Sequence, residues 1–117
     1  MNAPTTVLNG IEYPLNTTLR VAFEAQKANN HKPYIEVFKN IESMMLEKQI
    51  EILYLAFRLA NPEAAKTYPQ QMFLDYYLEN FTLKQVMDQL TGVISRIMGD
   101  DEDVQSNANP AEAAEGN

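Results

Sequence analysis

The sequence predicts a mainly α-helical domain over residues 1–99, with a small N-terminal β-hairpin and a disordered acidic tail over residues 100–117. Apolar residues recur at helical spacing through most of the chain, which predicts four to five packed helices. An Asn-Gly pair near the start lies between two short runs that favour strands, which predicts the hairpin. The last eighteen residues are acidic, small and polar, a composition that buries too little apolar area to fold.

Length and composition fit one domain with a hydrophobic core: 117 residues, of which 45% are hydrophobic. Cysteine is absent, which excludes disulfides, thiolate metal sites and a cysteine nucleophile. The formal net charge of -7 disfavours nucleic acid and anionic membranes as partners. The sequence shows neither a secretory leader nor an uncharged apolar run long enough to span a bilayer, so we expect a cytoplasmic protein.

A two-residue β-hairpin is expected over residues 5–13. Asn9 and Gly10 form the strongest short hairpin signal, because a type I′ turn needs positive φ at both central positions. Pro14 has no backbone N–H and ends the pairing. Pairing of Leu8 with Ile11 and of Thr6 with Tyr13 places these four side chains on one face, and we expect Leu8, Ile11 and Tyr13 to pack on the helices.

Two helices are expected between the hairpin and residue 41. The first begins after a cap at Asn16, Thr17 or Thr18. The second begins at Pro33, a residue suited to the first helical position because the N–H there has no partner. The expected apolar stripes are Leu15, Leu19, Ala22, Phe23 and Gln26 in the first helix, and Tyr34, Val37, Phe38 and Ile41 in the second.

A central, buried helix is expected from its cap at Ser43 to about Ala60. It is apolar on most of its circumference, which is typical of a helix surrounded by other elements. Asn61 and Pro62 end it, and residues 62–67 are expected to form a loop or loose turn. Its two apolar stripes consist of Leu46, Ile50, Leu53, Tyr54 and Phe57, and of Ile52, Leu55, Ala56 and Leu59.

Two further helices complete the expected domain. Pro69 opens the first, which is rich in aromatic residues and ends near Asn80. Thr82 and Gln85 have the spacing of a capping box for the last helix, and Gly99 is a natural stop. The expected apolar stripe of the last helix consists of Leu83, Val86, Met87, Leu90, Ile94, Ile97 and Met98.

No catalytic, cofactor-binding or metal-ligating residues are predicted. His31 is the single histidine and lies in a polar turn sequence, without a nucleophile motif or a second metal-ligand pattern. The acidic run from Asp100 to Asp103 lacks the glycine and the closing glutamate of a calcium-binding loop. A faint helix-turn-helix pattern leaves only residues 93–99 for a recognition helix, which is too short for DNA binding.

The order of the elements carries a resemblance to a known family. A hairpin over residues 7–13 is followed by helices over residues 19–26 and 33–38, and then by an apolar helix from Ile50 that ends near an Asn-Pro pair. Over about residues 5 to 98, this order resembles that of the tail assembly chaperones of long-tailed bacteriophages and Gram-positive prophages. The acidic tail after the last helix is similar in character to that of the short form of these chaperones. The resemblance implies a protein that binds the tape measure protein, keeps it soluble, helps recruit tail tube subunits and self-associates into an open spiral coat. It also implies a place in the host cytoplasm rather than in the mature virion.

The hairpin and three tyrosines are the expected sites of contact with other proteins. Self-association is expected through the open backbone edge of the strand from Thr5 to Leu8. Tyrosine is enriched at interfaces, although Tyr68, Tyr76 and Tyr77 could equally be half-buried core residues. The expected protein-interaction residues are Val7, Leu8, Ile11, Tyr13, Tyr68, Tyr76 and Tyr77.

The alternative function is a small acidic regulator that binds a protein by mimicking nucleic-acid charge. Such a mimic needs carboxylates spread over a folded face. Here four of the sixteen acidic residues are consecutive, from Asp100 to Asp103, and Glu112 and Glu115 belong to the same tail. An enzyme would need a convergent polar pocket, and the sequence offers no candidate for one.

Overall fold

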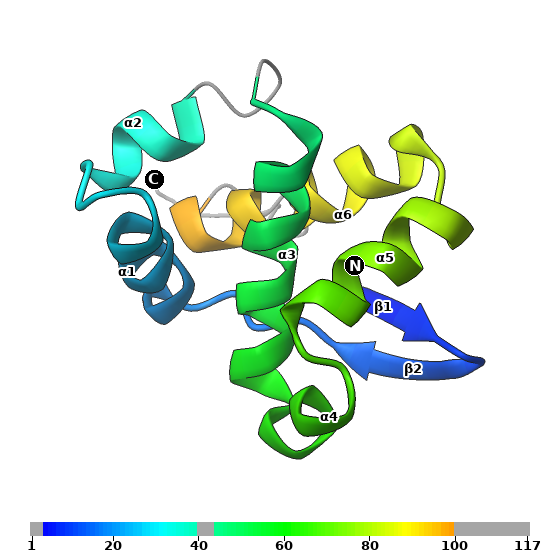
Figure 1. Ribbon diagram of the computed structural model, residues 1–117. Helices are drawn as coiled ribbons and strands as arrows, with labels where there is room; N and C mark the ends of the chain where they lie inside the picture. The colour runs from blue at the N-terminus through cyan, green and yellow to red at the C-terminus, as the bar shows by residue number, and fades with distance from the viewer. Residues whose placement is uncertain (1–3, 40–43, 100–117) are drawn as a thin grey trace, which may run out of the picture.

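The computed structural model describes residues 4–39 and 44–99, in which an antiparallel hairpin precedes six helices (Figure 1). This confirms the predicted fold class, mainly helical with a small N-terminal hairpin. The disordered tail predicted for residues 100–117 and the expected cap Ser43 lie outside the described residues. The elements are β1 (Thr5–Leu8), β2 (Ile11–Pro14), α1 (Leu19–Ala28), α2 (Tyr34–Lys39), α3 (Leu46–Ala60), α4 (Pro62–Thr67), α5 (Gln70–Asn80) and α6 (Leu83–Met98).

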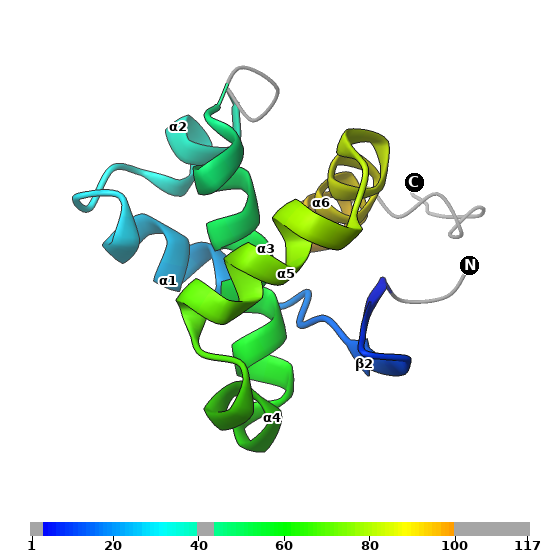
Figure 2. The ribbon, with the colours of Figure 1, turned by 45° about the vertical axis from the view of Figure 1, so that its right-hand side comes forward.

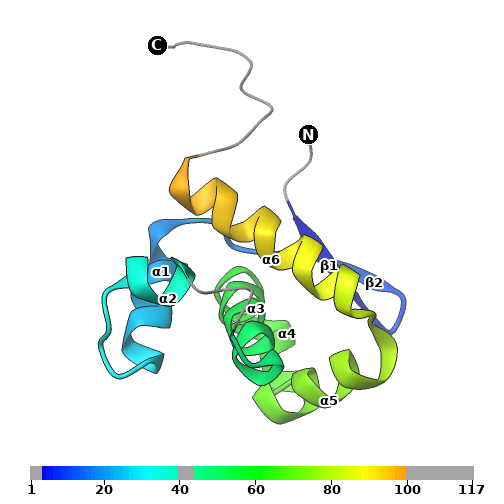
Figure 3. The same ribbon diagram turned by 90° about the horizontal axis from the view of Figure 1, so that it is seen from above.

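Helix α3 forms the centre of the fold. Figure 3 shows it nearly end-on, with α1 and α2 on one side, α5 on the other and α6 across a third side. Helices α2 and α4 lie near opposite ends of α3 (Figure 2). Eight of the fifteen residues of α3 are buried, which agrees with the prediction of a helix surrounded by other elements.

The hairpin has the predicted turn and register. Leu8 pairs with Ile11 and Thr6 pairs with Tyr13. Asn9 and Gly10 have φ values of 52° and 82°, so both central residues adopt the left-handed conformation of a type I′ turn. The second strand ends at Pro14, one residue beyond the predicted hairpin.

The two strands of the hairpin differ in their contact with the helices. Leu8 on β1 is fully buried, whereas Ile11, directly opposite on β2, is 56% exposed. The expectation that Ile11 packs on the helices was therefore wrong. Tyr13 contacts α3 through Phe57, with 5.4 Å between the ring centroids. The hydrogen bonds of Thr6 and Asn9 to Tyr77 and Tyr76 hold β1 against α5, so Leu8 is covered, whereas the turn end of β2 lies on the far side of β1 and leaves Ile11 in solvent.

Helix α1 turns a different face to the core than the sequence predicted. Thr18 is its N-cap, as one of the three expected candidates. Leu19 and Phe23, assigned to the buried stripe, are instead 69% and 49% exposed. The face towards the core carries small side chains, which let α1 lie close to α3, and that fit outweighs the larger apolar area of leucine and phenylalanine. The buried residues of α1 are Val21, Ala22 and Ala25.

Residues 62–67 form helix α4, so the prediction of a loop was wrong. Pro62 is the first residue of α4, where a missing N–H removes no helical hydrogen bond. The N–H of Ala65 donates to the carbonyl of Asn61 at 2.9 Å. The side-chain amide of Asn61 also donates to the carbonyl of Pro14 at 2.8 Å, which ties the bend between α3 and α4 to the hairpin. The Asn-Pro pair thus ends one helix and begins the next.

Helix α6 has the predicted ends but a shifted apolar face. Both hydrogen bonds of the Thr82–Gln85 capping box are present, and Gly99 follows the helix with a φ of 84°. Leu83 and Met98, assigned to the buried stripe, are exposed because they lie at the two ends of the helix, beyond the elements that cover its middle. The buried residues of α6 are Val86, Leu90 and Val93.

Candidate protein-binding surfaces

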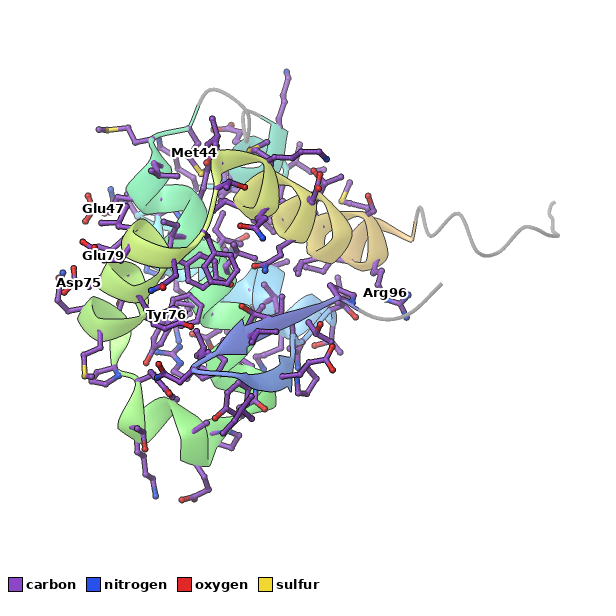
Figure 4. The ribbon with its side chains drawn as sticks, turned by 90° about the vertical axis from the view of Figure 1, so that its right-hand side faces the viewer. Met44, Glu47, Asp75, Tyr76, Glu79 and Arg96 are labelled. Atoms are coloured by element: carbon purple, nitrogen blue, oxygen red, sulfur yellow. The ribbon has the colours of Figure 1, made fainter. Side chains whose placement is uncertain are left out.

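The three predicted interaction tyrosines converge on the hairpin. The backbone N–H of Asn9 donates to the hydroxyl of Tyr76 at 2.9 Å, and the Asn9 side chain donates to the hydroxyl of Tyr68 at 2.7 Å. The hydroxyls of Thr6 and Tyr77 lie 2.6 Å apart. Figure 4 shows Tyr76 on the hairpin side of α5. These bonds fix the turn and the first strand to α5 and to the loop before it.

The Tyr77 hydroxyl is the buried end of this set of bonds. Its single proton is donated to the side-chain carbonyl of Gln89 at 2.5 Å, so Thr6 is the donor in the bond between Thr6 and Tyr77. The Tyr77 ring stacks on Phe73 and on Phe81, with centroids 4.6 Å and 4.1 Å away. Burial raises the pKa of the Tyr77 phenol well above its ordinary value, and the bonds with Thr6 and Gln89 offset only part of that rise.

The predicted interaction residues therefore divide by exposure. Val7 and Ile11 present their side chains to solvent. Leu8 and Tyr77 are buried within the described part of the chain, and Tyr13, Tyr68 and Tyr76 pack against the core. The sequence did not indicate that the tyrosines and the hairpin meet, because the hydrogen bond between Thr6 and Tyr77 joins residues 71 positions apart. Contact of these residues with another protein stays a prediction.

A second surface is an apolar groove of about 90 Å³ between the start of α3 and the turn from α5 to α6. Leu78 and Leu83 are its most exposed members, at 52% and 65%. Sequence periodicity assigned Leu46 and Leu83 to buried stripes and so missed the groove, because both residues lie in the first turn of a helix that continues into the core. We call this the leucine groove; its lining residues are Leu46, Ile50, Tyr77, Leu78, Phe81, Thr82, Leu83 and Val86.

Three carboxylates of α3 and α5 lie on one side of the molecule, and we call them the acidic rim: Glu47, Asp75 and Glu79. Figure 4 shows Glu47 on α3 and the other two on α5 pointing to the same side of the molecule. Glu47 and Glu79 directly follow the groove residues Leu46 and Leu78. None of the three takes part in an ion pair formed within residues 4–39 and 44–99. The rim is therefore a local excess of negative charge.

The outer edge of β1 borders a third surface, a wide groove of about 370 Å³. Leu8 and Ile11 close the two-residue turn as a hydrogen-bonded pair. The next pair, Val7 and Glu12, is therefore a non-hydrogen-bonded pair, in which the backbone N–H and C=O of each residue point away from the partner strand. The N–H and C=O of Val7 consequently point away from β2 and form the open edge that the hairpin sequence predicts. The far wall of this edge groove is formed by Tyr76, Asn80, Phe81, Gln85 and Gln89.

The described residues contain neither a group of metal-ligating side chains nor a helix that could span a membrane. No group of three or more His, Asp or Glu side chains in residues 4–39 and 44–99 is placed to hold a metal ion. His31 is exposed in the turn between α1 and α2. None of the helices described in the structure is long and apolar enough to cross a membrane.

Comparisons with protein-family models, with curated proteins and with solved structures each find no match to this chain. The three surfaces are therefore the features from which a function can be proposed. Two of them are apolar or offer open backbone, which are the properties of surfaces that bind other polypeptides.

Proposed function

We propose that this protein is a tail assembly chaperone of the kind found in long-tailed bacteriophages and prophages. It binds the tape measure protein in the host cytoplasm, keeps it soluble and helps recruit tail tube subunits. The observation that supports this proposal is the distribution of exposed apolar side chains. Every described strand and helix except α4 exposes at least one large apolar residue.

Exposed apolar side chains on several faces suit a protein that must cover a long helical partner. Such a partner is insoluble alone because its own apolar stripe faces water. A chaperone offers matching apolar area while a charged remainder keeps the complex in solution. Large exposed residues on opposite sides of the domain, such as Phe23 on α1 and Leu83 on α6, allow more than one protein contact at a time.

The distribution of charge disfavours the alternative, a nucleic-acid mimic. Among the described residues nine acidic side chains are matched by nine basic ones, so this part of the chain has no net charge. The formal charge of -7 comes from Glu42 and from six acidic residues in 100–117. A mimic would need its carboxylate excess on the folded surface, as in the acidic rim, but over a much larger area.

The test is co-expression with the tape measure protein encoded in the same genome. We expect the soluble fraction of the tape measure protein to increase several-fold and the two proteins to purify together. An unrelated acidic protein of the same size is the matched control, because it shows whether negative charge alone is enough. Persistent insolubility of the tape measure protein, or a genome without tape measure and tube genes near this one, would overturn the proposal.

A further inference from the structure

We infer that the leucine groove of one molecule receives the exposed face of helix α1 from a second copy of this chain. The inference concerns the self-association that the family resemblance implies, and it rests on the proposed function for its biological role. Two observations carry it: the apolar residues left exposed on α1, and the opposite charge of the two surfaces.

The exposed face of α1 carries the apolar pattern of a helix that binds in a groove. Leu19 and Phe23 are four residues apart, so they lie on the same side of the helix, one turn from each other. Both are apolar and exposed, although α1 buries other residues in the core. Pairs of this spacing are the usual anchors when a helix occupies an apolar groove. The leucine groove offers complementary apolar walls from Leu78 and Leu83.

The same face of α1 is basic. The guanidinium of Arg20 and the ammonium of Lys27 lie 5.6 Å and 5.4 Å from the centre of the Phe23 ring. Both, together with Arg58 of α3, approach the carboxylate of Glu24 at 3.9 Å. Three cations around one carboxylate leave a net positive patch on both sides of Phe23.

The charges of the two surfaces are complementary. Glu47 and Glu79 follow the groove residues Leu46 and Leu78, and neither has an ion-pair partner among the described residues. When Phe23 enters the leucine groove, these carboxylates are available to the cations beside its ring. Ion pairs at the margin of an apolar contact fix orientation and suppress other pairings more than they add affinity. The apolar contact supplies the affinity and the charges select α1.

The positions of the two surfaces decide what kind of assembly results. Helix α1 and helix α5 lie on opposite sides of α3 (Figures 1 and 3). Contact between different faces on opposite sides of a molecule is head-to-tail, so each added copy leaves one free face at each end of the chain of molecules. An assembly of this kind is open and can grow along an elongated partner.

The experiment uses two leucines in equivalent local positions. Leu19 and Leu83 are each the first residue of a helix and each follows a capping threonine, so Leu19→Ser and Leu83→Ser make the same local change on the two surfaces. We expect each variant to weaken self-association about tenfold in sedimentation equilibrium or light scattering, because an exposed apolar anchor is lost. Met72→Ser is the control, because it removes an exposed apolar side chain of α5 that belongs to neither surface.

Mixing the two variants gives the deciding measurement. Leu19→Ser keeps an intact groove and Leu83→Ser keeps an intact α1 face, so an equimolar mixture should form a one-to-one dimer as tightly as the wild type associates. Charge reversal gives a second, independent reading. Arg20→Glu with Lys27→Glu, and Glu47→Lys with Glu79→Lys, should each weaken association, and mixing the two proteins should restore it. Circular dichroism and the melting temperature confirm that each variant is folded.

Three outcomes would overturn the inference. The first is a wild type that stays monomeric at concentrations near 1 mM, which also contradicts the self-association that the resemblance implies but leaves the binding of the tape measure protein untouched. The second is a wild type that associates while mixtures of variants associate no better than each variant alone. The third is loss of tape measure solubility in Leu83→Ser with self-association unchanged, which would assign the groove to that partner and leave the proposed function intact.

Discussion

The hydroxyl of Tyr77 on α5 lies 2.6 Å from the hydroxyl of Thr6 on β1, and both side chains are only 1% exposed. This contact joins the hairpin to the helical core, because Tyr77 also donates to Gln89 on α6. Three elements that are far apart in the sequence thus share one buried phenol oxygen. The arrangement fixes the position of β1 and therefore the direction of its open edge.

The first prediction concerns the stability that this contact provides. Tyr77→Phe leaves the buried hydroxyl of Thr6 and the half-buried side-chain carbonyl of Gln89 without their partner, so we expect the free energy of unfolding to fall by about 1–3 kcal/mol. Thr6→Val together with Tyr77→Phe should cost less than the sum of the single changes, because the double variant removes both partners of one bond. Chemical denaturation measures all three, with the exposed Tyr34→Phe as control. A loss for Tyr77→Phe no larger than that of the control would contradict the prediction.

The second prediction concerns alkaline pH. Burial raises the pKa of Tyr77 above its ordinary value of 10.0, so above that pH the unfolded chain releases the phenol proton while the folded chain keeps it. The contribution of Tyr77 to stability is therefore complete below about pH 10 and declines as the pH rises further. The decline approaches about 1.4 kcal/mol per pH unit for one proton.

Denaturation at a series of pH values between about 9 and 11 tests this, since the window begins at the ordinary phenol pKa. Tyr77→Phe should make the fall of the unfolding free energy with pH less steep, by up to the value for one proton, about 1.4 kcal/mol per pH unit. Part of the slope should remain, because burial also raises the pKa of Tyr54, against an opposing effect of Arg58. Equal slopes for the wild type and Tyr77→Phe would contradict the prediction, because they would show that the phenol titrates alike in the folded and the unfolded chain.

The third prediction concerns the central helix. Leu53 and Phe57 of α3 are fully buried, and the Phe57 ring contacts Tyr13, Tyr68 and Phe73 at centroid distances of 5.4, 6.3 and 5.1 Å. Leu53→Ala and Phe57→Ala should each lower the free energy of unfolding by about 2–5 kcal/mol, because each leaves a cavity. Met45→Ala, at an exposed position just before α3, should change it by less than about 0.5 kcal/mol. Thermal or urea unfolding distinguishes these values, and a small loss at Phe57 would disagree with the aromatic packing.

The fourth prediction concerns the open edge of β1. Val7→Pro removes an N–H that points away from β2, so the hairpin should form while pairing with a neighbouring subunit weakens. Val7→Thr keeps the N–H and is the control. Light scattering across concentration measures the difference, and equal association of both variants would exclude the edge as an assembly element. Deletion of residues 1–14 is a poorer test, because it also removes the buried side chains of Thr6 and Leu8.

Features that depend on a few neighbouring residues could be predicted from the sequence alone. The turn at Asn9 and Gly10 follows from the positive φ that both positions require, and the two ends of α6 follow from its capping box and from Gly99. The burial of α3 was also predictable, because a helix that is apolar around most of its circumference has to be surrounded.

Which apolar residues stay exposed depends instead on how the helices pack together. Leu19 and Phe23 match the helical period as well as their buried neighbours do, but packing selects the face that fits closest and leaves the other in solvent. Leu83 also matches the period, but it is the first residue of α6 and lies beyond the elements that cover the middle of that helix. The bond between Thr6 and Tyr77 likewise joins groups that are distant in the sequence. The leucine groove is of the same kind, since its walls come from α3, α5 and α6 and no local pattern brings them together.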